Sequence, residues 1–232
     1  MTQPGDTIRK GYGRDPNTRR RNKLAPDPGV RQAIMAAAAK SVREQGVRGL
    51  SIAAVLDYAQ LSTRAFYRHF ESKDQLVAAV FLDMARTEML RVRSRMEAAP
   101  TPIEAVVAWI DGRLDLAFDE EIAAELRCWS LEAQSQMVSS PELVEPAYNA
   151  TLEPLIEELQ RGMENGFFRD IVPATAARSI QGVVWASTER QWTKGDGKRE
   201  DVRERAIRFC LRGLGVTPEA IAKIATRQSP VS

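Results

Sequence analysis

Cysteine, histidine and long apolar runs are scarce in this sequence. Its two cysteines, Cys128 and Cys210, lie far apart without a metal-binding spacing, so neither a disulfide framework nor a zinc site is expected. We expect both thiols to pack as small apolar groups. The single histidine and the absence of metalloprotease, nucleophile-elbow and phosphate-loop motifs argue against an enzyme. No catalytic residues, no metal and no cofactor are therefore expected.

No stretch of the sequence is apolar enough to cross a membrane. The longest run without a charged residue, from Ser179 to Thr188, spans ten residues, whereas a membrane helix needs about 20. The N-terminal segment carries charges with no apolar stretch behind them, so nothing directs secretion. We expect a cytoplasmic protein without a membrane partner.

Charge is unevenly distributed along the chain, although the net charge is only +2. Residues 1–28 hold seven basic and three acidic residues, residues 29–98 hold eleven and seven, and residues 99–232 hold fifteen and twenty-one. A basic N-terminal portion on an acidic remainder is typical of a protein that contacts a polyanion at one end. Nucleic acid is the first candidate, and anionic lipid is the second.

The N-terminal part of the chain divides into an arm and a first helix. Residues 1–27 contain very few apolar residues, which predicts a flexible basic arm. Asp27 and Pro28 are typical of a helix start, and Gly46 is typical of a helix end. The expected apolar face of this helix consists of Val30, Ile34, Ala37, Ala38 and Val42.

Three further helices, each preceded by a serine N-cap, are expected over residues 52–58, 63–70 and 73–98, with caps at Ser51, Ser62 and Ser72. Phe66 and Phe70 share one face of the middle helix, and we assign both to the core. The buried stripe of the long helix is expected to contain Leu76, Val80, Phe81, Met84 and Met89. Three short helices joined by short turns describe a helix-turn-helix unit, here at about residues 51–70.

The helical period continues beyond residue 102, and no alternating strand pattern occurs. Breaks near residues 118–119, 139–141, 165–166, 172–173 and 195–197 predict five helices of about 15 to 25 residues each. The predicted fold class is all-α. We expect a first domain over residues 28–98 and a larger second domain over residues 99–232.

Several short motifs between residues 30 and 76 carry the most specific signal. They are the Gly46 helix end, the Leu50-Ser51-Ile52 cap, the Ser62 turn, the run Phe66-Tyr67-Arg68-His69-Phe70 and the Ser72-Lys73 helix start. With these motifs the segment resembles the DNA-binding domain of the TetR family of transcriptional regulators. The rest of the chain resembles the family in length, in its helical pattern and in the passage GFFRDIVPATAA. The resemblance implies a C-terminal domain that binds an effector and dimerises.

Two positions depart from the family pattern. Gln60 stands where glycine is common, and Leu56 stands where a small alanine is frequent. A left-handed conformation at Gln60 would cost about 1 kcal/mol relative to glycine, or else the turn differs.

The N-terminal turn of a recognition helix meets base edges, while its flanks meet phosphates. We expect the guanidinium of Arg64 to read guanine, and Thr63 and Ala65 are the candidates for contacts with thymine methyl groups. The other DNA-binding candidates are Ser51, Ser62, Tyr67, Arg68, His69 and Lys73. For Tyr67, His69 and Lys73 the resemblance implies backbone contacts. Core packing of Tyr67 and a purely structural helix end at His69 are the alternatives.

The basic cluster Arg19, Arg20 and Arg21 in the arm has two interpretations, which the sequence leaves open. Basic arms beside recognition helices often enter a narrow minor groove. A solvated run of charges without a role is the other interpretation.

The resemblance implies a homodimer whose interface is built from the last two long helices, expected over residues 174–194 and 201–214. Apolar and small residues on both segments fit this role, and ordinary packing within the chain is the alternative. The expected interface residues are Gly182, Val183, Val184, Ser187, Val202, Ala206, Phe209, Cys210 and Gly213.

All four tryptophans lie between residues 103 and 194, interleaved with polar side chains, which is typical of a small-molecule pocket. The candidate ligand-binding residues are Trp109, Arg113, Trp129, Gln134, Tyr148, Asn149, Gln181 and Trp185. For at least two of the tryptophans, simple core packing is the competing explanation. In the family, a bound effector shifts the helix that follows the DNA-binding domain.

The sequence therefore predicts a DNA-binding regulator whose partners are a palindromic double-stranded operator, a second copy of the chain and a small-molecule effector. Repression is expected from the family. The alternative is a helical adaptor that binds protein or an anionic membrane through the basic arm, without sequence-specific DNA binding.

Overall fold

The computed structural model describes residues 27–225, except for the side chains of residues 124 and 125. Every regular element within this range is a helix, so the all-α prediction is confirmed. The helices are α2 (Pro28–Gly49), α3 (Ile52–Tyr58), α4 (Thr63–Tyr67), α5 (Lys73–Glu97), α6 (Pro102–Phe118), α7 (Glu120–Ser139), α8 (Pro141–Glu164), α9 (Pro173–Lys194), α10 (Arg199–Gly213) and α11 (Pro218–Ala225). None of them is long and apolar enough to cross a bilayer.

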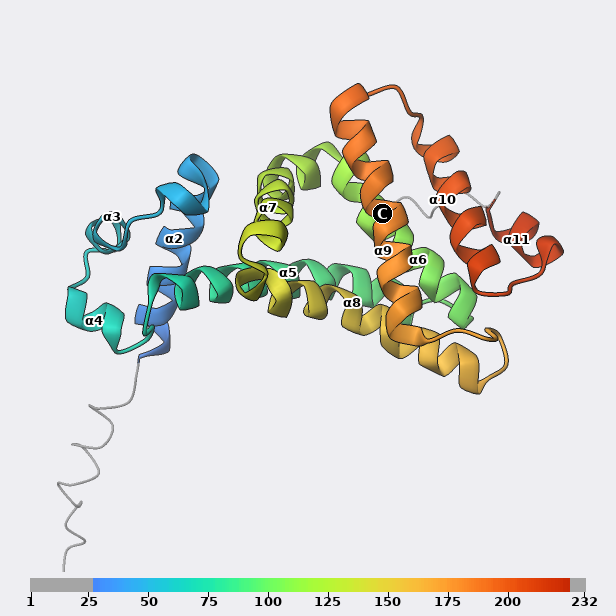
Figure 1. Ribbon diagram of the computed structural model, residues 1–232, viewed down its shortest axis with the longest axis horizontal. Helices are drawn as coiled ribbons and strands as arrows, with labels where there is room; N and C mark the ends of the chain where they lie inside the picture. Colours follow the sequence, from blue (N-terminus) through green and yellow to red (C-terminus); the bar gives the residue numbers. More distant parts are fainter. Residues whose placement is uncertain (1–26, 226–232) are drawn as a thin grey trace, which may run out of the picture.

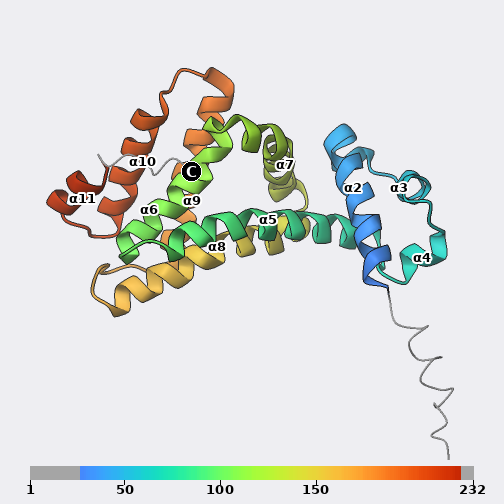
Figure 2. The same cartoon turned by 180° about the vertical axis from the view of Figure 1, so that it is seen from behind.

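The long helix α5 joins two groups of helices, which lie at opposite ends of the molecule (Figure 1). We call α2–α4 the head and α6–α11 the body. Helix α8 packs along α5, α9 packs on α8 and α6, and α10 and α11 lie on the side of α9 away from the head (Figure 2). Helix α7 lies between the head and α9.

Local capping signals set most of the predicted helix starts. The side chains of Asp27, Ser62 and Ser72 accept hydrogen bonds from the backbone N–H groups of Gly29, Ala65 and Gln75. Ser51 holds the N-cap position of α3, but its side chain makes no capping bond.

The recognition helix is shorter than predicted. Helix α4 ends at Tyr67, and Arg68 and His69 form a turn before Phe70. This corrects the expected helix over residues 63–70. Phe70 nevertheless reaches the core, where it is 2% exposed beside the fully buried Phe66. The aromatic pair therefore packs as expected, but across a turn and not along one helix face.

The turn between α3 and α4 has the left-handed conformation that glycine favours. Gln60 has φ 54°, and its side-chain Nε2 donates a hydrogen bond of 2.8 Å to the carbonyl oxygen of Asp57. The helix-turn-helix path is thus kept without glycine, and the local hydrogen bond partly offsets the backbone strain.

Three expectations for the C-terminal part are wrong. Six helices, not five, follow residue 102 within the described range, because Pro218 starts the additional helix α11. Cys128 is exposed and does not pack as an apolar group, whereas Cys210 is buried. Four of the expected interface residues, Val184, Val202, Ala206 and Cys210, belong to the core of the body, because the inward faces of α9 and α10 pack on α6 and on each other.

Head and body share a continuous apolar core at their junction. The core that contains Phe66, Phe70 and Leu76 also contains Trp129 of α7 and the group Leu143, Val144 and Ala147 of α8. The ring of Phe81 on α5 meets the ring of Trp129 edge to face, with centroids 5.4 Å apart. The first helices of the chain are therefore not packed independently of the rest.

Candidate DNA-binding surface and ligand cavity

The exposed face of α4 presents the side chains expected to contact DNA. Thr63 and Arg64 occupy the first turn of the helix and are exposed, as is the capping residue Ser62. Phe66 anchors the opposite face of α4 in the core. This arrangement leaves the N-terminal turn of α4 free to enter a major groove, and the base contacts of Arg64 and Thr63 remain predictions.

The flanks of α4 carry further candidates for phosphate contacts. Tyr67 is 61% exposed while its ring edge packs against Phe66, so core packing does not account for it. Arg68 is exposed, and His69 and Lys73 are half-buried. These side chains lie next to the recognition helix, in positions suited to the DNA backbone. Ser51, at the start of α3, is also exposed and makes no capping bond.

The basic cluster Arg19, Arg20 and Arg21 lies outside the described residues. Its interpretation as a minor-groove arm remains a prediction.

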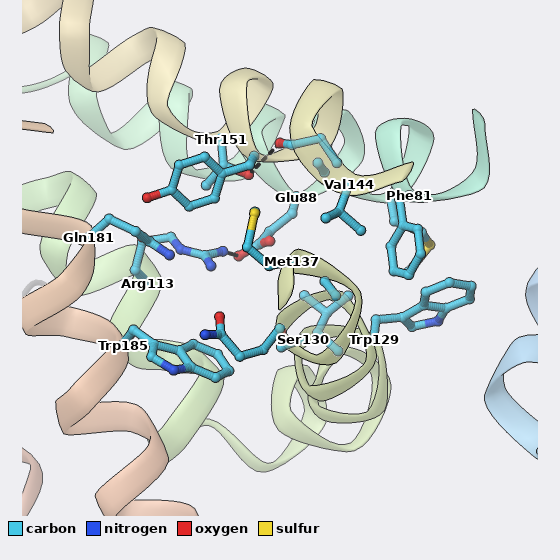
Figure 3. Close-up of a pocket in the computed structure, with 17 residues that line it drawn as sticks. Phe81, Glu88, Arg113, Trp129, Ser130, Met137, Val144, Thr151, Gln181 and Trp185 are labelled. Carbon is cyan, nitrogen blue, oxygen red and sulfur yellow. Dashed lines mark hydrogen bonds and ion pairs between the residues drawn. The ribbon is translucent and has the colours of Figure 1, made fainter. Parts of the chain in front are cut away.

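A cavity at the centre of the body brings five helices together (Figure 3). Its empty volume is about 720 Å³, a figure that includes open solvent at its mouth. Six of the eight predicted ligand-binding residues line it: Arg113, Trp129, Gln134, Tyr148, Gln181 and Trp185. We call it the central cavity.

The other two predicted ligand-binding residues lie elsewhere. Trp109 is fully buried in the core of the body, where its Nε1 donates a hydrogen bond of 3.2 Å to the carbonyl oxygen of Thr151. It is a packing residue and not part of the cavity. Asn149 is exposed and lines an outer groove, which shares Gln134, Tyr148 and other residues with the central cavity.

Helix α5 contributes to the cavity, which was not expected from the sequence. Phe81, Met84, Ala85 and Glu88 line it from α5, at the spacing of one helix face. The sequence assigns Phe81 and Met84 to the core. Glu88 follows Met84 by one turn on the same face of the helix, and its charge indicates that this face becomes polar there. Met137 of α7 and Thr151 of α8 were also missed.

A buried ion pair spans the central cavity. Arg113 of α6 extends toward Glu88 of α5 and pairs with it (Figure 3), and the two side chains are 9% and 10% exposed. The Nε of Arg113 and the Oε1 of Gln181 are buried without hydrogen-bond partners. Burial raises the pKa of the Tyr148 hydroxyl, and the nearby Arg178 opposes this shift, so the hydroxyl is neutral near pH 7.

Helix α7 contacts the cavity with one face and the head with the other. Trp129 and Ala133 line the cavity, whereas Oε1 of Glu132 accepts a hydrogen bond of 3.2 Å from the backbone N–H of Val47 in the head. That N–H follows Gly46, whose φ of 70° makes the kink in α2. A change in the position of α7 would therefore reach the head directly.

The exposed helix-turn-helix face and the helical body with its cavity define a DNA-binding protein of the helix-turn-helix class. Comparison with known proteins agrees: the sequence model of the family "Bacterial regulatory proteins, tetR family" matches residues 34–80. The repressor KstR2 of Mycobacterium tuberculosis H37Rv is 23% identical over 189 residues, which cover 79% of this chain and 92% of KstR2. KstR2 of Mycolicibacterium smegmatis is also 23% identical, over 79% of this chain and 90% of that protein.

Solved structures share the fold. The structure of RolR in complex with its ligand resorcinol matches 92% of this chain and 98% of the RolR chain, with a TM-score of 0.61 and 19% identity. The regulator FadR of Bacillus subtilis in complex with stearoyl-CoA covers 78% of this chain and 98% of its own, with a TM-score of 0.61 and 15% identity. The family match at residues 34–80 and these relatives support a DNA-binding transcriptional regulator of the TetR family. Its relatives are regulators and not enzymes, and the adaptor alternative finds no support.

Proposed function

We propose that this protein is a ligand-responsive repressor, which binds a palindromic operator as a homodimer and releases it when a small molecule enters the central cavity. The observation that carries the proposal is the position of α5. Its first two turns pack in the core of the head through Leu76, Val77 and Val80, and its next turns line the cavity through Phe81, Met84 and Glu88. A ligand that displaces these turns moves the head.

The outer face of α9 and α10 supports the dimer. Phe209 is 67% exposed, although it is a large apolar residue, and it lines a surface groove with Val172 and Val183. A Cβ atom at Gly182 or Gly213 would meet open space, with no atom within 4 Å beyond the adjoining residues and the helix's own backbone, so both positions have room for a closely packed helix of a second copy. A face of this kind can pair with itself around a two-fold axis.

The dimer is tested with Phe209→Asp, and Leu90→Asp serves as the matched control. Leu90 is similarly exposed, at 71%, but lies on α5 outside the α9 and α10 face. We expect Phe209→Asp to be monomeric by light scattering and to lose operator affinity, because a monomer contacts only one half-site. Leu90→Asp should remain dimeric. A dimeric Phe209→Asp variant would place the interface elsewhere.

The DNA-binding part is tested by selecting duplexes from a random library with the wild-type protein and measuring affinity for the selected sequence. Specific binding that weakens steeply as salt rises is expected. Resorcinol, the ligand of RolR, is the first candidate for release of the selected duplex. An absence of sequence preference in the selected pool would contradict an operator-binding function.

A further inference from the structure

The central cavity contains two charged side chains among the described residues that line it, and they neutralise each other. These are Glu88 and Arg113, the buried ion pair between α5 and α6. The remaining described lining is apolar or uncharged, and includes Trp185, Tyr148 and Gln181. The outer groove also holds one acid and one base, Glu145 and Arg178. The cavity therefore offers a ligand no net charge.

This balance disfavours ions of either sign inside the cavity. A carboxylate that approached Arg113 would meet Glu88 beside it, and an ammonium group that approached Glu88 would meet Arg113. Either ion would lose its hydration without an unshared counter-charge to replace it. An uncharged molecule avoids this penalty, and the apolar lining from Phe81, Met137 and Val144 favours its burial.

The unpartnered polar atoms indicate which uncharged group fits. Among the described residues that line the cavity, three polar atoms are buried without a partner: the donors Nε of Arg113 and Nε1 of Trp129, and the acceptor Oε1 of Gln181. Trp129 lies at the opposite end of the cavity from Arg113 and Gln181 (Figure 3), so the atoms of Arg113 and Gln181 are the two considered together. A hydroxyl group both donates and accepts, so one hydroxyl can serve both atoms. Figure 3 shows that both side chains lie at the same end of the cavity.

We propose that Glu88 sets the ligand class of the central cavity: by neutralising Arg113 it restricts the cavity to uncharged, largely apolar molecules that carry a hydroxyl group, and it excludes organic anions. This inference rests on the proposed function, in that the central cavity is the ligand site. Glu88 is then a specificity-determining residue that acts through Arg113.

The test compares two probes of nearly equal size, benzyl alcohol and benzoate, at pH 7.5 by titration calorimetry. The wild-type protein should bind benzyl alcohol at least about tenfold more tightly than benzoate, because the carboxylate of benzoate would lie beside the like charge of Glu88. Glu88→Gln leaves the shape nearly unchanged and frees the charge of Arg113. This variant should gain at least about tenfold in benzoate affinity. Glu157→Gln is the control, since Glu157 pairs with Arg93 at an exposed site outside the cavity.

The double variant Glu88→Gln with Arg113→Gln keeps the cavity neutral and avoids an unpaired buried charge, so it covers the case in which Glu88→Gln does not fold. It should retain the wild-type preference for benzyl alcohol. The inference is overturned if wild type binds benzoate as tightly as benzyl alcohol, if a folded Glu88→Gln gains no benzoate affinity, if the double variant prefers benzoate, or if neither probe binds the wild-type protein.

Operator binding distinguishes this inference from the proposed function. If benzyl alcohol binds with the expected preference but leaves the affinity for the selected duplex unchanged, the inference holds and the ligand response fails. If benzoate releases the duplex from the wild-type protein, the ligand response holds and the assignment to Glu88 fails.

Discussion

Replacing Glu132 by alanine should loosen the contact between the body and the head. The Glu132 carboxylate accepts a hydrogen bond of 3.2 Å from the N–H of Val47, and Val47 is 7% exposed. Water therefore cannot readily replace the lost acceptor. A hydrogen bond to a charged group contributes about 1.5–3 kcal/mol, and an unsatisfied buried donor costs about 1–3 kcal/mol. We expect the free energy of unfolding of Glu132→Ala to fall by about 1–3 kcal/mol.

Urea denaturation measures the change in unfolding free energy, and amide hydrogen exchange locates it at Val47. Glu132→Gln is the matched control, because it keeps an acceptor oxygen and should lose less than the alanine variant. The Val47 amide should exchange faster in Glu132→Ala, whereas amides in the core of the body, such as that of Ile110, should change less. Equal stability and equal exchange at Val47 in wild type and Glu132→Ala would refute the reasoning.

Further predictions concern the recognition helix, its turn and the thiols. Arg64→Ala should relax base preference at one position per half-site and weaken the binding free energy by about 1–3 kcal/mol. Lys73→Ala should weaken binding to all duplexes alike and reduce the slope of log affinity against log salt concentration by about one unit per half-site. Measuring the affinity for single-base operator variants at several salt concentrations separates the two effects. Gln60→Gly should be about 1 kcal/mol more stable in urea than Gln60→Ala, because both lose the side-chain bond to the Asp57 carbonyl and only glycine relieves the positive φ, and equal stabilities would contradict strain at this turn. A thiol reagent at pH 8 should modify the exposed Cys128 and spare Cys210 in the native protein, because burial raises the pKa of the Cys210 thiol to about 12. Because the pKa of the Cys210 thiol is raised in the folded state, its contribution to the free energy of unfolding is complete below the pKa of the unfolded thiol. This contribution is lost as the pH rises toward about 12. The free energy of unfolding of Cys210→Ala should therefore fall less over that pH range.

Local signals made the beginnings of the helices predictable. Asp27, Ser62 and Ser72 cap helices as expected. An N-cap is predictable because the side-chain oxygen and the backbone N–H that it accepts from are only two or three residues apart in the sequence. The end of α4 has no such signal. Phe70 shares a helical face with Phe66 in the sequence, but the chain leaves the helix after Tyr67 and still delivers Phe70 to the core. Tertiary packing decides that end.

The cavity was only partly predictable, because helical periodicity shows which side chains share a face but not which faces oppose each other. Arg113 and Gln181 were expected at a ligand site from composition, and they do meet there. Glu88, the partner of Arg113, lies on α5, whose apolar stripe the sequence assigns to core packing. Trp109 fits the same composition argument but points into the centre of the body. Val184 and Cys210 were likewise expected at the dimer interface, but they lie in the core. The packing of α6 against α9 and α10 determines which face of each helix points inward.

The shared core at the junction explains how a ligand in the body can act on a recognition helix in the head. Phe81 and Trp129 each line the central cavity and each belong to the apolar core that holds Phe66. Densely packed side chains do not absorb a displacement by compression, so they transmit it or repack. A ligand that shifts either ring therefore acts on the support of α4 without crossing a flexible linker. Helix α7, which carries Trp129, also contacts the head through the hydrogen bond from Val47 to Glu132. Helices α5 and α7 therefore each connect the central cavity to the head.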